Sequence, residues 1–261
     1  MLSEAKNLQR ALYLMEVDTA LELVRDSEFF QGIIETGVVP REIDRAYYTV
    51  TKVPDILADV ACVLRHTGDE RHMDLAAEAY RRVKPFVRSR TYLTRRPWNR
   101  ELQPSAHTVN NAADSYLFSL TATGNPVEAL CEGYSYFAHM SGKVEGWDLV
   151  AVYQTYLKTA FKARRTIERS KIRFHGCVST WNVLREESAE YLRLVGELTD
   201  RDQDHWWYIE AQVLNCMACL KWQKTEAKMA AVQRWLERAQ EVHGEKMGRC
   251  IEGWKSFLAS V

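Results

Sequence analysis

Apolar residues recur at helical spacing along almost the whole chain. Between residues 4 and 25 they come three to five positions apart, at Leu8, Leu12, Met15, Ala20 and Leu23. This spacing places them on one face of an amphipathic helix. The same periodicity predicts further helices over residues 73–83, 127–140, 148–169, 180–198, 205–222, 225–242 and 245–259. The pattern therefore predicts an all-α fold with essentially no sheet.

One of these segments, residues 205–222, is apolar on most of its circumference. Its large apolar residues are Trp206, Trp207, Ile209, Val213, Leu214, Met217 and Leu220. A helix that is apolar nearly all round is expected to lie at the centre of its fold, in contact with neighbours on several sides.

The clearest joint between two helices lies at Gly124. Glycine readily takes the left-handed conformation that ends a helix. Asn125 is then a suitable N-cap, Pro126 fits the first helical position, and Glu128 stands where a capping box needs an acid. We therefore predict a helix–turn–helix joint in residues 120–128. Residues 64–69 repeat its pattern of Leu-x-x-Thr-Gly followed by Asn or Asp.

The distance between these joints predicts the domain organisation. Gly68 and Gly124 are 56 residues apart, whereas a helical-hairpin repeat takes about 34–35 residues. We expect N-terminal helical hairpins in residues 1–83, a basic insertion or loop in 84–106, and a central and C-terminal helical-repeat region in 107–261, within one continuous domain. Three prolines punctuate the insertion: Pro85, Pro97 and Pro104. Upstream, Gly37 and Pro40 mark another helix end and restart.

Several short motifs lie between residues 111 and 161. They are Ala113-Asp114-Ser115-Tyr116-Leu117, Gly124-Asn125, Glu128-Ala129-Leu130, Tyr134 and Phe137 before Met140, and Asp148-Leu149-Val150-Ala151-Val152-Tyr153. In these motifs the chain resembles the pentatricopeptide and tetratricopeptide superfamily of helical repeats, over about half its length. The resemblance implies a right-handed α-solenoid-like array of antiparallel helical hairpins with a concave binding face. Because the spacing between Gly68 and Gly124 departs from the family, the one-base-per-repeat RNA code is not transferred.

Basic residues gather in two stretches, although the formal net charge is zero. Residues 81–100 hold eight and no acid, with Phe86, Tyr92 and Trp98 interleaved, and residues 158–173 hold seven against one acid. The rest of the chain has 20 basic and 34 acidic residues. Arginine binds phosphates in a bidentate manner and aromatic rings stack on unpaired bases. The residues predicted to bind RNA or a protein partner are Arg81, Arg82, Lys84, Arg88, Arg90, Tyr92, Arg95, Arg96, Trp98, Arg100, Lys162, Arg164, Arg165, Arg169, Lys171 and Arg173.

The alternative is that these charges pair with acidic faces of neighbouring helices or are merely solvated. The two interpretations differ in what neutralises residues 81–100. Since that stretch contains no acid, it cannot neutralise itself locally. The counter-charge can come from the acidic remainder of the chain or from an external partner. The prolines and the broken period predict a projecting loop, which favours the external partner.

No motif points to catalysis, a metal or a cofactor. Cys216 and Cys219 form a C-x-x-C within a helix, not at the helix N-terminus where redox cysteines lie. The seven histidines do not fall at metal-binding helical spacings, and the chain has no phosphate-binding glycine loop and no nucleophile elbow. We therefore expect no catalytic residue, no metal ligand, no cofactor and no small-molecule substrate.

Location and function follow from these patterns. The six cysteines lie mostly in apolar stretches, the chain has no run of 18 apolar residues, and the first 20 residues lack a secretory pattern. We expect a reducing intracellular compartment, with a mitochondrion, another organelle and the cytoplasm all open, and no membrane. The function expected is a non-catalytic scaffold or adaptor subunit of a larger assembly, such as an organellar ribonucleoprotein. The alternatives are a stand-alone RNA-binding repeat protein and a helical enzyme whose site combines residues distant in sequence.

Overall fold

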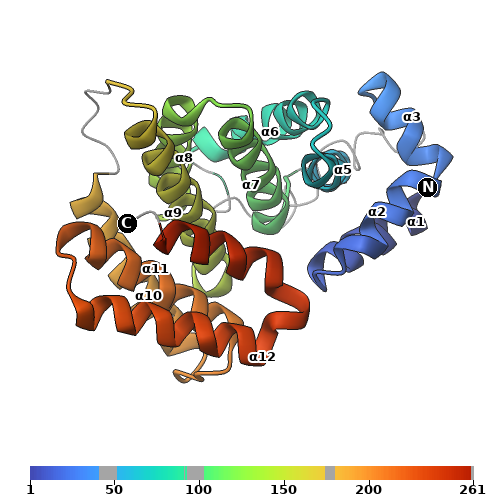
Figure 1. The fold of residues 1–261 in the computed structure, drawn as a ribbon. Coiled ribbons are helices and arrows are strands. Elements are labelled where there is room, and N and C mark those ends of the chain that lie inside the picture. Colours follow the sequence, from blue (N-terminus) through green and yellow to red (C-terminus); the bar gives the residue numbers. More distant parts are fainter. Residues whose placement is uncertain (41–51, 91, 93–102, 174–179, 260–261) are drawn as a thin grey trace. The chain divides into compact units, whose positions relative to one another are not determined.

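The computed structural model describes residues 1–40, 52–90, 92, 103–173 and 180–259, and every regular element in them is a helix (Figure 1). The prediction of an all-helical fold is therefore confirmed for these residues. The chain forms two compact units, Met1–Phe174 and His175–Val261. Their division falls inside residues 107–261, the region that the sequence pattern treated as one helical-repeat stretch.

The first unit begins with three short helices, α1 (Leu2–Tyr13), α2 (Val17–Asp26) and α3 (Glu28–Thr36). The periodicity of residues 4–25 predicted a single helix here, and that prediction is wrong. The chain breaks at Met15, which has a positive φ of 61°. Apolar spacing alone did not reveal this break, because α1 and α2 both keep helical periodicity. All three helices pack against α5.

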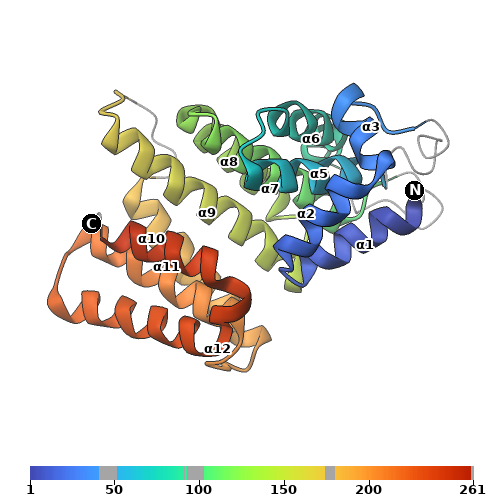
Figure 2. The same cartoon turned by 45° about the vertical axis from the view of Figure 1, so that its right-hand side comes forward.

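Five longer helices complete the first unit: α5 (Val53–Thr67), α6 (His72–Arg88), α7 (Ala106–Ala122), α8 (Pro126–Met140) and α9 (Gly146–Arg169). Each packs against the next, and α7 also contacts α5 and α9. Figures 1 and 2 show α7 between the α5–α6 pair and the α8–α9 pair. Its position explains why the largest fully buried side chains include Leu57, Leu117, Leu130, Tyr136 and Tyr156.

The glycine joints are confirmed, whereas the capping box is not. Gly68 and Gly124 have φ values of +76° and +80°, and Pro126 opens α8. The Asn125 side chain makes no capping bond and instead donates to Thr123 Oγ1 at 3.1 Å. Glu128 accepts a hydrogen bond from the Tyr116 hydroxyl at 3.2 Å. Tertiary contact with α7 has therefore replaced the local cap.

The left-handed conformation at Gly124 has a testable cost. We expect Gly124→Val to lower the free energy of unfolding by about 1–3 kcal/mol, because a β-branched residue is strained at positive φ. A Cβ at this position would have no atom within 4 Å, so crowding does not contribute. Gly142→Val is the control, since Gly142 has equally open space without a positive φ. Equal unfolding midpoints in urea for the two variants would contradict the expectation.

The expected insertion at 84–106 is wrong at its start. Helix α6 continues through Pro85 to Arg88. Proline lacks a backbone N–H and usually kinks or breaks a helix. The helix nevertheless continues here, with Val83 and Val87 buried on either side of Pro85. Tyr92 is 1% exposed, and its hydroxyl donates to the carbonyl oxygen of Pro104 at 2.6 Å. Residues 93–102 lie outside the described part of the chain, as do residues 41–51 after Pro40.

The second unit consists of α10 (Trp181–Leu198), α11 (Trp206–Trp222) and α12 (Glu226–Leu258). Helix α11 contacts both of the others, which confirms the prediction of a central helix. Its buried residues include Ile209, Val213, Leu214, Met217 and Leu220, whereas Trp206 and Trp207 are half-buried.

Helix α12 folds back on itself (Figures 1 and 2). The Lys255 ammonium donates to Gln240 Oε1 at 3.3 Å, although a straight helix would separate residues this far apart in sequence by roughly 22 Å. The reversal therefore lies between Gln240 and Lys255, a segment that contains three glycines, and glycine is conformationally permissive. The sequence predicted two helices, 225–242 and 245–259. The structure has one helix that reverses between these two segments.

Candidate functional site

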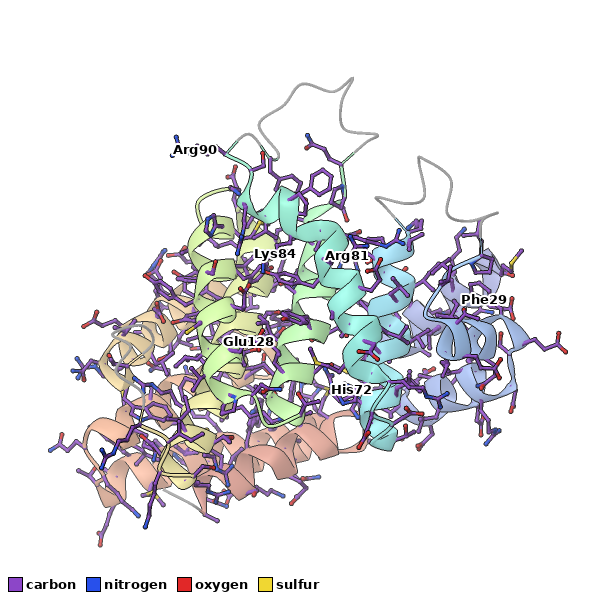
Figure 3. All side chains as sticks on the ribbon, turned by 90° about the horizontal axis from the view of Figure 1, so that it is seen from above. Phe29, His72, Arg81, Lys84, Arg90 and Glu128 are labelled. Carbon is purple, nitrogen blue, oxygen red and sulfur yellow. The ribbon has the colours of Figure 1, made fainter. Side chains whose placement is uncertain are left out.

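Four of the predicted binding residues, all on α6, share two glutamates within the first unit. The Nε of Arg81 lies 2.7 Å from Glu78 Oε2, and the Nε of Arg82 lies 2.8 Å from Glu78 Oε1. Glu132 of α8 is 3.1 Å from the Lys84 ammonium and 3.9 Å from the Arg88 guanidinium. Acids elsewhere in the same unit therefore supply part of the counter-charge for these four residues. Arg81 and Lys84 are labelled in Figure 3.

Of the aromatic residues in the same stretch, the structure describes Phe86 and Tyr92. Tyr92 is buried, and its ring packs against Phe86 with centroids 6.0 Å apart. Arg90 is exposed and points away from the helices in Figure 3. The other predicted residues, Arg95, Arg96, Trp98 and Arg100, lie outside the described residues.

The second stretch forms a basic stripe on α9. We give this name to Lys158, Lys162, Arg165 and Arg169, whose spacing of four, three and four residues places them on one helix face. Of the remaining predicted residues, Arg164 lies on the same helix outside the stripe. Lys171 and Arg173 follow the helix end and are exposed.

The stripe begins beside a cluster that the sequence did not reveal. The ring of Phe118 on α7 has three cations around its centroid: the Arg65 guanidinium carbon at 5.1 Å, the Lys162 ammonium at 5.9 Å and the Lys158 ammonium at 6.0 Å. Cations are attracted to the face of an aromatic ring. Arg65 comes from the last turn of α5, so three helices contribute to this Phe118 cluster.

The Phe118 cluster concentrates positive charge and includes an unsatisfied hydrogen-bond donor. The Nη1 atom of Arg65 is buried and has no hydrogen-bond partner in the described structure, while its Nη2 lies 3.5 Å from Cys62 Sγ. The pKa of Lys162 is lowered, first by desolvation of its ammonium and then by the charge of Arg65, although the residue as a whole is exposed. Burial and then Arg65 also lower the pKa of His72. These three groups show that the local field is positive.

Helix dipoles explain part of this pattern. Arg65 and Arg169 lie in the last turns of α5 and α9, where the negative end of the helix dipole favours cations. Lys162 lies about two turns before the end of α9, so this explanation does not extend to it. Burial, and then the charge of Arg169, lower the pKa of Arg165. The stripe therefore keeps like charges close together away from the helix end as well.

A second polar cluster is acidic and buried. Asp55 and Asp59 are one turn apart on α5 and are only 5% and 6% exposed. The Thr108 hydroxyl donates to Asp55 Oδ2 at 3.0 Å, and the Asn111 amide donates to Asp59 Oδ1 at 2.9 Å. Burial raises the pKa of Asp59 to about 8 and also raises the pKa of Asp55. The sequence analysis missed this pair, although two acids spaced i, i+4 in the apolar run of residues 53–64 were a visible signal.

The described residues leave only a small space beside the buried acid pair. The pair lines a cavity of about 30 Å³ together with Lys6, Gln9 and Lys52, which is roughly the space of one water molecule. Within the described ranges, no three His, Cys, Asp or Glu side chains are close enough together to hold a metal ion. The Phe118 cluster and the stripe supply positive charge and hydrogen-bond donors, the groups that pair with carboxylates and phosphates.

In comparisons with known proteins, no family model, no curated protein and no solved structure matches this chain. Among the described residues, no helix combines the length and apolar character that crossing a bilayer requires. The resemblance to helical repeats therefore stays a prediction, and function has to be inferred from the residues themselves.

Proposed function

We propose that this chain is a non-catalytic helical scaffold of a larger assembly, which docks an acidic segment of a partner protein. The observation that carries the proposal is the Phe118 cluster, where Arg65 and Lys162 share one aromatic ring. In the described structure no carboxylate is recorded against either head group. A partner that brings carboxylates would neutralise charges that repel one another in the free chain.

The arrangement of the first unit supports a scaffold. Helix α5 contacts α7, α7 contacts α9, and α6 contacts α8. In a solenoid of helical hairpins, the first helices of successive hairpins line the concave binding face. The Phe118 cluster takes its residues from α5, α7 and α9, the alternate helices of such an array. We propose, as part of the same function, that these helices form a right-handed α-solenoid-like array.

RNA binding is the alternative, and the basic stripe favours it. Single-stranded RNA is held by phosphate contacts together with aromatic rings that stack on bases. The described aromatics near the basic residues are already engaged, Tyr92 by burial and Phe118 by the cations around it. An acidic protein segment needs only the charges and therefore fits this surface better.

Cross-linking in the source cells tests the proposal. The tagged full-length chain and its Lys162→Glu variant are isolated after nuclease treatment, and the cross-linked residues are mapped by mass spectrometry. We expect cross-links between α9 and an acidic segment of one partner protein, at least fivefold fewer in the variant. Arg81→Glu is the control, because Arg81 already faces Glu78. Complexes that nuclease removes entirely would establish the RNA alternative instead.

A further inference from the structure

The Phe118 cluster holds a half-buried arginine with one buried, unsatisfied hydrogen-bond donor. This donor is the Nη1 of Arg65, which has no hydrogen-bond partner within the described structure. A buried donor without an acceptor is costly, and more so when it is charged. A bound ion or ligand is one way to satisfy such a group.

Lys162 provides the second half of the same site. Its ammonium lies 5.9 Å from the centroid of the Phe118 ring, and the Arg65 guanidinium carbon lies 5.1 Å from it. Helices α5 and α9 both pack on α7, so the two head groups are held by a rigid frame. Lys158 lies one turn before Lys162 on α9, whereas Arg165 and Arg169 follow Lys162.

We infer that Arg65 and Lys162, held over Phe118, form a clamp for a single carboxylate side chain of the acidic segment, with the basic stripe binding the acids that follow it. This inference rests on the proposed function and names the residues that recognise the partner. Arg65 would donate from the buried edge of its guanidinium, and Lys162 from the solvent side. The Phe118 ring holds both cations in place without competing for the anion, since it offers no hydrogen-bond donor.

The chemistry of the site favours a carboxylate over a nucleotide. A nucleotide offers a base as well as a phosphate, and the base needs an open aromatic face. The cations around Phe118 occupy the neighbourhood of its ring. The basic stripe also advances by one helical turn per residue, about 5–6 Å, which side chains of an acidic segment can follow.

Binding of a fluorescent decaglutamate peptide to the full-length chain tests the clamp, with labelled ten-nucleotide oligouridylate as the competing probe. Fluorescence anisotropy gives the affinity for each. We expect the peptide to bind more tightly, and Arg65→Gln and Lys162→Gln each to weaken it about 10-fold, because each removes a charge-assisted hydrogen bond; this is a loss of about 1.4 kcal/mol. The double variant should lose less than the product of the two, because both groups hold one carboxylate.

Controls separate the clamp from general charge and from folding. Arg81→Gln removes a positive charge that is paired with Glu78 and should leave peptide affinity unchanged. Lys162→Arg keeps a donor at the site and should retain binding. Because Lys162 is exposed, its variants keep the fold even if Arg65→Gln does not, and circular dichroism checks both.

The outcomes distinguish the Arg65–Lys162 clamp from the proposed scaffold function. Peptide binding that ignores Arg65→Gln and Lys162→Gln but is lost in Arg165→Gln overturns the clamp and leaves the proposed function standing. Lys162-dependent binding of oligouridylate with no peptide binding overturns the proposed function and assigns the cluster to phosphates. Absence of binding to either probe overturns both.

Discussion

Raising the pH from 5 to 8 should destabilise the first unit by about 1 kcal/mol per pH unit, through Asp59. Burial raises the pKa of this carboxyl to about 8 from an ordinary value of 3.8. Between these values the folded state holds a proton that the unfolded chain releases, so stability falls as the pH rises. The contribution is fully present below pH 4 and is lost as the pH passes 8.

The surroundings of Asp59 explain why its charged form is disfavoured. The neighbouring Asp55 repels a second negative charge, while Asn111 donates one hydrogen bond and Lys52 offsets part of the cost. Lys6 of α1 also lines the adjoining cavity. His107 lowers the pKa of Asp55 after burial has raised it. None of these groups forms a direct ion pair with Asp59 among the described residues.

Asp59→Asn isolates this effect. The new amide oxygen can still accept the hydrogen bond from Asn111, and it carries no charge at any pH. Urea unfolding between pH 5 and pH 8 should therefore give a flatter profile, with the variant more stable than the natural chain at pH 8. Asp69→Asn is the control, because a hydrogen bond from Arg71 holds the pKa of Asp69 at about 2. This carboxyl is ionised in the folded and the unfolded chain between pH 5 and pH 8, so its removal should leave the slope unchanged there. An unchanged slope in Asp59→Asn would place the proton uptake elsewhere.

Leu117→Ala should destabilise the first unit by about 3–4 kcal/mol, in the upper range for truncating a buried leucine. Leu117 is fully buried on α7, the helix that contacts α5, α6, α8 and α9. On α8 the facing residue is Gly133, which has no side chain to fill the space. Because helices on several sides hold the frame, the cavity should persist. The free energy of unfolding in urea measures the loss.

Gly133→Ala provides the matched rescue. A Cβ at Gly133 would lie 3.5 Å from Thr159 Cγ2 and 3.8 Å from Leu117 Cδ1, which are ordinary contacts. Alone, this change should stabilise α8 by roughly 0.5–1 kcal/mol through helix propensity. Combined with Leu117→Ala, it should recover more than that, because the added methyl group borders the cavity. If the changes in the free energy of unfolding are simply additive, the added methyl group does not fill the cavity, and the surrounding helices have already closed it.

The parts of the fold that sequence predicted well are those with local causes. Gly68 and Gly124 end their helices because a left-handed residue is needed there, and glycine is the residue that supplies it. Helix α11 was recognisable as central because no polar face interrupts it. The break at Met15 and the continuation of α6 past Pro85 were not predicted, because the local sequence pattern does not determine either of them.

The candidate site was harder to predict, because its partners are distant in sequence. Basic residues in 81–100 looked unneutralised, yet Glu132 reaches Lys84 from α8, 48 residues away. Arg65 and Phe118 join Lys162 only once α5, α7 and α9 pack together. The i, i+4 spacing on α9 was the only part of this site that the sequence displayed. A charge count shows where basic residues are and leaves open which of them lack a counter-charge.

The fold-back of α12 brings two tryptophans of the second unit together, and their fluorescence can report on its unfolding. The Trp206 and Trp254 rings stack with centroids 5.3 Å apart and planes 8° from parallel, and His243 touches the same Trp206 ring at 5.6 Å. Six of the eight tryptophans lie beyond residue 175. Indole emission during denaturation therefore follows residues 175–261, while backbone ellipticity follows the whole chain. Two curves that fail to coincide would measure the separate melting of the two units, and neither curve alone would describe the protein.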